Sequence, residues 1–197
     1  MEKTLTQGTE DGRRQRSERS RQAIIDAMLS LMTEGILVPT AQQIAERAGV
    51  GIRSVFRHFP DMESLFAMAD QRIRSQHSEL FSGGDREGTF EERLQHAVER
   101  HAMAYEMIGN LFLGTKAMLW RHQILRDQYL RTQRELRKDL DRWLPELLDL
   151  STQEREMVDA VASFETWNRL REFQRLSKTN SIQLITDLLR RILAHEP

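Results

Sequence analysis

The stretch TAQQIAERAGVGIRSVFRHF, residues 40–59, predicts two short helices joined by a tight turn. Thr40 can cap the first helix, because a threonine hydroxyl accepts hydrogen bonds from the backbone N–H groups of a first turn. Gly49 can adopt the left-handed conformation of the turn without steric cost. A second helix is expected to begin near Ile52, with two apolar side chains four positions apart on its inner face.

This pair of helices predicts a helix-turn-helix, in which the second helix enters the major groove of DNA. Ala45 is small enough to let the second helix cross the first closely. The outward face of the second helix carries groups that suit phosphates and base edges. Its residues are Ile52, Arg53, Ser54, Phe56, Arg57 and His58. The alternative is an ordinary helical hairpin with a solvated charged face.

The same pattern extends on both sides of the turn in an ordered, gap-free set of positions. These positions are Ile24, Ile25, Ala27, Glu34, Gly35, Thr40, Ile44, Ala45, Ala48, Gly49, Val50, residues 54–59 and Leu65. With them, residues 21–66 resemble the N-terminal domain of TetR-type transcriptional repressors. The resemblance implies that a set of side chains lies at or near DNA. That set is Thr40, Gln42, Ile52, Arg53, Ser54, Phe56, Arg57 and His58.

Two positions depart from the family pattern. The family usually has tyrosine where Phe56 stands and lysine where Met62 stands, so two phosphate contacts implied by the resemblance are missing here. Residues 13–21 hold five arginines against a single acid, Glu18, and a local basic cluster of this kind can bind phosphate. A solubilising, disordered tail is the alternative for this segment.

Composition narrows the function classes. The chain has 197 residues, a net charge of −1 and no cysteine, so disulfides, thiolate catalysis and cysteine-ligated zinc are excluded. No apolar run approaches the roughly 20 residues of a membrane span, and the N-terminus lacks the apolar centre of a signal peptide. We therefore expect a cytoplasmic protein.

The fold class predicted is all-α, with about nine helices in two parts. We expect a mobile N-terminal tail over residues 1–16, a DNA-binding domain over 17–77 and an effector-binding and dimerisation domain over 78–197. The Gly-Asn pair at positions 109 and 110 should end one helix, and residues 111–123 should begin another.

The last part of the chain predicts a subunit interface. One helix is expected from Ser151 to about Leu176, with an apolar residue at every third position, so that its apolar stripe winds around the helix. A single neighbour cannot bury such a stripe, and a final apolar helix from about Ser181 also needs a cover. We therefore predict a four-helix interface of a homodimer. Its residues are Leu170, Phe173, Ile185, Leu188, Leu189 and Ile192. Two buried helices of a monomer are the alternative.

An effector pocket is implied by the resemblance, since TetR-type proteins generally bind a ligand in their C-terminal half. Candidate residues are His101, Met103, Tyr105, Phe112, Trp120 and Trp167. The alternative is that these residues form the core, with His101 hydrogen-bonded inside it.

Three histidines, His96, His101 and His122, raise the possibility of a metal site. His96 and His101 are five positions apart and so face different sides of one helix, which disfavours a zinc pair. We expect no metal, no cofactor and no catalytic residues.

Together these patterns predict a sequence-specific, homodimeric DNA-binding repressor that a small-molecule effector releases from a near-palindromic operator. The alternative is a helical ligand- or protein-binding module that does not bind DNA. A ligand-binding enzyme is a weaker third possibility.

Overall fold

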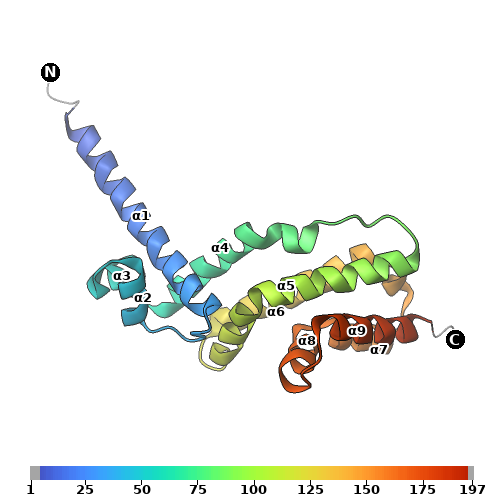
Figure 1. The fold of residues 1–197 in the computed structure, drawn as a ribbon. Coiled ribbons are helices and arrows are strands. Elements are labelled where there is room, and N and C mark those ends of the chain that lie inside the picture. The colour runs from blue at the N-terminus through green and yellow to red at the C-terminus, as the bar shows by residue number, and fades with distance from the viewer. Residues whose placement is uncertain (1–4, 195–197) are drawn as a thin grey trace. The chain divides into compact units, whose positions relative to one another are not determined.

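The computed structural model describes residues 5–194, with side chains over 12–76 and 83–194. Within residues 5–194 the chain forms nine α-helices and no strands (Figure 1). It divides into two compact units. Unit 1 comprises residues 1–75 and 113–127, and unit 2 comprises residues 76–112 and 128–197. The all-α prediction is confirmed. Among the described residues, no helix is both long and apolar enough to cross a bilayer.

Unit 1 is built around the predicted pair of short helices. Helix α1 (Leu5–Thr33) packs against α2 (Ala41–Ala48) and α3 (Ile52–His58), and α4 (Met62–Ser82) follows. The core of unit 1 contains apolar side chains from all four helices. They include Ile24, Ile25, Met28, Met32, Ile44, Ala45, Val55, Phe59, Leu65, Phe66 and Ala69.

The helix-turn-helix forms as its local residues dictate. The Thr40 side chain accepts a hydrogen bond from the backbone N–H of Gln43, and the Gln43 side chain accepts one from the backbone N–H of Thr40, which completes a capping box. Gly49 closes α2 in the left-handed conformation with φ 66°. Ala45 is 2% exposed, so it lies at the crossing, where a small side chain is needed.

Helix α1 begins earlier than expected. The sequence predicted a mobile tail over residues 1–16, whereas the described part of that tail is helical from Leu5; its first four residues lie outside the described chain. Arginine, glutamate and glutamine are good helix formers, and within the extension Arg16 Nε donates to the Gly12 carbonyl at 3.1 Å across one turn. These local preferences extend the helix.

Helix α5 (Phe90–Met118) is continuous where a break was predicted. Ile108 has non-helical dihedral angles (φ −117°, ψ 15°), so the helix bends there, but it resumes and continues through the glycine that follows. Both Ile108 and Leu111 are buried, and this packing on either side of the bend keeps the segment helical. Helix α6 (Gln123–Trp143) follows after a short turn.

The end of α5, the start of α6 and the turn between them belong to unit 1. Gly114 lies so close to the segment after α1 that a Cβ placed there would sit 2.6 Å from the Leu37 carbonyl oxygen. Such an approach requires glycine, because a backbone oxygen cannot swing aside. Residues 113–127 are thereby fitted against the N-terminal helices, which the linear domain boundaries of the prediction did not include.

The predicted helix from Ser151 to Leu176 is several elements. Helix α7 (Thr152–Ala162) ends at Ser163, α8 (Phe164–Asn168) follows, and the π-helical turn η2 (Arg169–Phe173) precedes α9 (Lys178–Leu193). The Ser163 hydroxyl accepts from the Thr166 backbone N–H at 3.2 Å and so caps a new helix. The argument from one winding stripe was therefore wrong, because the stripe is divided between separate helices. The predicted start is confirmed, because Ser151 caps α7 and forms a capping box with Glu154.

Candidate functional site

Helix α3 exposes one face to solvent, and this face carries both charged and apolar side chains. Its inward side chain, Val55, is 1% exposed, and Phe59 directly after the helix is 2% exposed. On the opposite side Ile52 is 40% and Phe56 is 49% exposed, and Arg53 and Arg57 are exposed with them. A seven-residue helix is too short to be stable alone, so these two buried anchors hold its outward face in place.

His58 differs from its predicted outward orientation. Its Nε2 atom is buried and has no hydrogen-bond partner among the described residues. Burial lowers the pKa of His58, and the positive charges of Arg57 and Arg21 lower it further. The ring as a whole is partly buried, and only its Nε2 atom is fully covered in this conformation.

The two predicted DNA-contacting residues of α2 lie at its start and are exposed. The Thr40 hydroxyl is already used in the cap, where it donates to Gln43 Oε1 at 3.0 Å. Gln42 Nε2 donates to Glu46 Oε1 at 2.6 Å across one turn. Both side chains can reach solvent, and the Gln42 amide can exchange its partner for a phosphate.

One ion pair ties α1 to α2 and was not predicted. Arg47 binds Glu34 through two hydrogen bonds of 2.6 and 2.7 Å, and Ser30 joins the same network. The hydrogen bonds from Arg47 and Ser30 lower the pKa of Glu34 to about 2. This fork fixes the far ends of the two helices, and it removes Arg47 from the set of cations available to a phosphate.

The start of α4 is held by the turn between α5 and α6. Asp61 caps the helix, accepting from the Ser64 backbone N–H at 2.7 Å. His122 Nδ1 lies 3.1 Å from Glu63 Oε1, and the His122 ring meets the edge of Phe66 with centroids 5.2 Å apart. The sequence singled out His122 only as a possible metal ligand, but its place is against α4.

Unit 2 contains a small cavity that is partly open to solvent and has room for about one water molecule. Its walls are almost entirely apolar. They are formed by Ala97, Val98, His101, Ala102, Tyr105, Leu140, Ala162, Trp167, Ile185 and Leu189. Of the predicted pocket residues, the structure thus brings His101, Tyr105 and Trp167 together. Burial raises the pKa of Tyr105, whose hydroxyl donates to the Ala162 carbonyl at 2.9 Å.

Three other predicted pocket residues do not line this cavity. Phe112 stacks on Phe164 with centroids 4.7 Å apart and meets the edge of Tyr105, so it supports the wall from behind. Met103 is only partly buried and is not part of the wall. Trp120 is 78% exposed and belongs to unit 1, so its assignment was wrong. A tryptophan in an apolar run suggested burial, but the run ends at the turn after α5.

His101 joins a buried polar cluster that the sequence did not reveal. Its Nε2 lies 3.2 Å from Asp139 Oδ2, and Arg86 Nη2 donates to Asp139 Oδ1 at 2.9 Å. Asp139 is 2% exposed, although it stands in a charged run of α6 that reads as a solvated face. The guanidinium of Arg86 also lies over the Trp143 ring at 5.1 Å. A buried carboxylate needs such partners, because its charge is costly without them.

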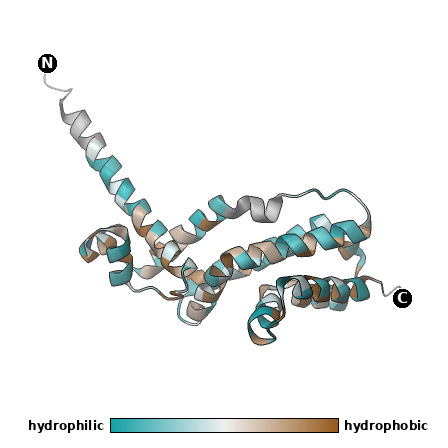
Figure 2. Ribbon diagram, viewed as in Figure 1, coloured by the Kyte–Doolittle hydropathy of each residue, from teal (hydrophilic) through white to brown (hydrophobic). Residues whose placement is uncertain are grey.

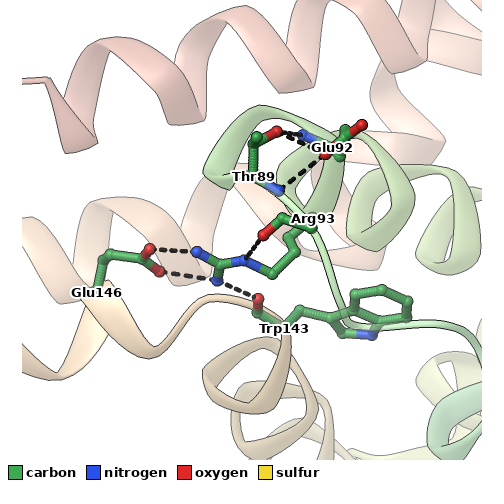
Figure 3. A network of polar contacts seen from close by, with 6 residues as sticks. Thr89, Glu92, Arg93, Trp143 and Glu146 are labelled. Atoms are coloured by element: carbon green, nitrogen blue, oxygen red, sulfur yellow. Dashed lines mark hydrogen bonds and ion pairs between the residues drawn. The ribbon is translucent and has the colours of Figure 1, made fainter.

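A second polar network in unit 2 joins the start of α5 to the end of α6 and the residues that follow it. Arg93 donates to both carboxylate oxygens of Glu146, at 2.5 and 3.1 Å, and to the Trp143 carbonyl at 2.9 Å (Figure 3). Figure 3 also shows the capping box of Thr89 and Glu92 at the start of α5. The network fixes the beginning of α5 against the end of α6, and its residues do not line the cavity.

The predicted dimer residues separate into two groups. Leu170, Ile185 and Leu189 are buried within the core of unit 2, and the last two line the cavity, so they are not available to a partner. Phe173 is 76% exposed, and Leu188 and Ile192 are partly exposed. For the second group the interface remains a prediction. Periodicity identified the apolar face of α9, but it did not show which residues of that face are buried by the rest of the same chain.

Among the described residues, no group of three histidines or acids could hold a metal ion. Residues 24–69 match the family model described as bacterial regulatory proteins, tetR family. No curated protein sequence matches the chain.

Solved structures show the same fold over nearly the whole chain. A transcriptional regulator from Rhodococcus sp. Rha1 has a TM-score of 0.67 at 17% identity, covering 90% of this chain and 95% of that chain. A tetR-family transcriptional regulator from Streptomyces coelicolor has a TM-score of 0.64 at 20% identity, covering 90% and 92%. A TetR transcriptional regulator from Rhodococcus sp. RHA1 has a TM-score of 0.55 at 15% identity, covering 91% and 99%.

Proposed function

We infer that this chain is a DNA-binding transcriptional regulator. Its residues 24–69 match the tetR family model, and its fold is that of TetR-type regulators. The observation that carries this function is the outward face of α3. Arg53 and Arg57 are exposed there beside Ile52 and Phe56, on a helix anchored by Val55. Two guanidinium groups next to apolar surface suit guanine edges, phosphates and thymine methyl groups in a major groove.

A homodimer is the second part of the proposal. Leu184, Leu188 and Ile192 recur at every fourth position of α9, beside the stripe that the core buries, and Leu184 is 37% exposed. Together with the exposed Phe173 they form an apolar surface that a second copy would cover. A twofold dimer presents two recognition helices to successive major-groove faces and so requires a near-palindromic operator.

An effector that releases DNA is the third part. The cavity of unit 2 is much smaller than typical small-molecule sites, so a ligand would have to widen it, and its apolar wall includes one polar side chain, His101, which is paired with Asp139. This lining suits a small, mostly apolar molecule with one hydrogen-bonding group. Repression, with release on effector binding, is the outcome that we propose.

The route for such a signal follows the helices themselves. Helices α5 and α6 line the cavity in unit 2, and the turn that joins them holds the start of α4 through His122 and Glu63 in unit 1. A ligand that shifts α5 or α6 would change how this turn supports α4 and, through it, α3. Coupling of this kind amounts to about 1–3 kcal/mol and must be reciprocal, so DNA would weaken effector binding equally.

Selection of bound sites from a pool of random duplex DNA tests the function. A regulator should enrich related, near-palindromic sites, and the purified protein should then bind them far better than shuffled sequences of the same length. A helical ligand- or protein-binding module, the alternative, would enrich nothing above background. A regulator of this kind would act in the cytoplasm, and it needs no catalytic residue.

A further inference from the structure

Helix α1 carries a basic segment ahead of the DNA-binding core. Five arginines stand in residues 13–21 against one acid, Glu18, and all side chains from Arg13 to Arg19 are exposed. In Figure 1 this half of α1 extends beyond α2 and α3, and Figure 2 shows that its described part is hydrophilic. The exposed segment contributes nothing to the apolar core, so folding of unit 1 does not explain its charge.

The segment approaches the recognition helix at its C-terminal end. The Arg21 guanidinium lies 5.6 Å from the centre of the Phe59 ring, and the charges of Glu18 and Arg21 both act on His58. Arg14 stands seven residues before Arg21, which places it on the same helical face about 10 Å further along the axis. Arg14 therefore continues the face of Arg21 outward from the end of α3.

The ion pairing of these arginines also differs from that of other arginines in unit 1. Arg47 pairs with Glu34, Arg72 with Asp26 and Arg74 with Asp70. By contrast, no ion pair joins Arg13, Arg14, Arg16 or Arg19 to any carboxylate within the described part of the chain; Arg16 and Arg19 donate only to backbone carbonyls one turn earlier. Their positive charge is thus available to an anionic partner.

We propose that Arg13, Arg14 and Arg16 on the N-terminal extension of α1 bind backbone phosphates of the DNA that flanks the base pairs read by α3. The proposal rests on the proposed function, because it assigns a second contact surface to the same duplex. These arginines would also offset the uncharged side chains of Phe56 and Met62, positions at which the domain offers no cation. Phosphate contacts of this kind add affinity and carry no sequence information.

The test is the salt dependence of binding to the selected operator by the full-length protein. Arg13, Arg14 and Arg16 are replaced together by alanine, which preserves helix propensity. The slope of log Kobs against log salt should become shallower by about 0.9 for each phosphate that the variant no longer neutralises. The ratio of affinities for the operator and for shuffled DNA should stay constant. Circular dichroism checks that the variant remains folded.

A matched control separates a direct phosphate contact from a change in net charge. Arg131, Arg134 and Arg142 are exposed on α6 in unit 2, and their replacement by alanine removes the same charge. The control should keep the wild-type slope. An unchanged slope in the first variant, or an equal change in the control, would overturn the proposal while leaving the proposed function intact. Failure of the wild type to enrich any site would instead reject the function on which it rests.

Discussion

At the scale of single residues, the state of each arginine decides what it can bind. Arg47 is held by two short hydrogen bonds to Glu34, so it stabilises the join between two helices. Arg53 makes no ion pair with a described carboxylate, and the one hydrogen bond of Arg57 within the described chain goes to the Ser54 hydroxyl, at 3.5 Å. Side chains without competing partners lose less when they bind a base or a phosphate. The recognition face therefore carries two available guanidinium groups.

Replacement of Arg53 by alanine should relax base preference at one operator position. An arginine that binds guanine through two hydrogen bonds contributes about 1–3 kcal/mol of discrimination against the wrong base. Affinities for operators with single-base changes measure the effect. Arg72→Ala is the control, because Arg72 pairs with Asp26 at 3.2 Å. An equal loss on every sequence would show that Arg53 contacts phosphate instead.

The stability of unit 1 should depend on the ionisation of His58. Its pKa is lowered in the folded state by burial and nearby arginines, so the unfolded chain, with a pKa of 6.5, binds the proton more tightly. The destabilisation is absent above that pKa, and the free energy of unfolding falls as pH drops below it. Thermal unfolding at about pH 7.5 and about pH 5.5 measures this.

The substitution His58→Gln should reduce that loss of stability at low pH. His96→Gln, at an exposed position in unit 2, serves as the control and should leave the dependence as in the wild type. If both variants lose stability with falling pH as steeply as the wild type, the buried ring nitrogen of His58 is not the responsible group.

At the scale of elements, the turn between α2 and α3 sets the angle at which the recognition helix is presented. The Val50 backbone N–H donates to the Ala45 carbonyl at 3.0 Å across the turn, and Gly49 supplies the left-handed residue that this pattern needs. Gly51 follows two positions later with φ −71°, a conformation open to any residue. Only one of these two glycines is therefore required by backbone geometry.

Gly49→Ala and Gly51→Ala form a matched pair. Added Cβ atoms would meet nothing within 4 Å at either site, so packing cannot distinguish them. The alanine at 49 must adopt a positive φ and should destabilise the protein by about 1–2 kcal/mol. The alanine at 51 should change stability by no more than about 0.5 kcal/mol, since its φ is ordinary. Chemical denaturation compares them, and equal effects would contradict the role given to φ.

At the scale of the whole molecule, the proposed function needs two copies of the chain. Helices α4, α5 and α6 each contribute residues to both units, so unit 1 and the cavity-bearing unit 2 share three helices. The partly exposed apolar residues of α9, with Phe173, are what remains unburied after the chain has folded on itself. A partner that covers them would bring two recognition helices to one operator.

Leu188→Glu should convert the proposed dimer to a monomer, because a partly exposed apolar position would then place a charge in the proposed interface. Sedimentation velocity measures the state. Leu148→Glu is the control, since Leu148 is 71% exposed on η1 (Pro145–Asp149) and lies outside the proposed surface. A dimer that persists in Leu188→Glu would reject this interface, and operator affinity should fall only in the variant that becomes monomeric.

The parts of the candidate site that depend on residues close together in the sequence could be predicted. The outward face of α3 followed from helical periodicity, which did not show that the Nε2 atom of His58 is covered. In the second unit, residue types suggested a pocket and named three of its lining residues. They could not indicate Asp139, whose partner His101 is 38 positions away. Trp120 was misplaced because an apolar run does not show where it leaves the core.

By itself, the sequence determined the elements that depend on neighbours within about four positions. The caps at Thr40, Thr89 and Ser151 and the turn at Gly49 belong to this class, since a cap or turn is formed by residues adjacent in the chain. Only the tertiary structure decided which apolar faces are covered by the chain itself and which polar groups meet inside. The physical reason is that periodicity specifies the direction of a side chain, whereas burial depends on a neighbour brought there by the fold.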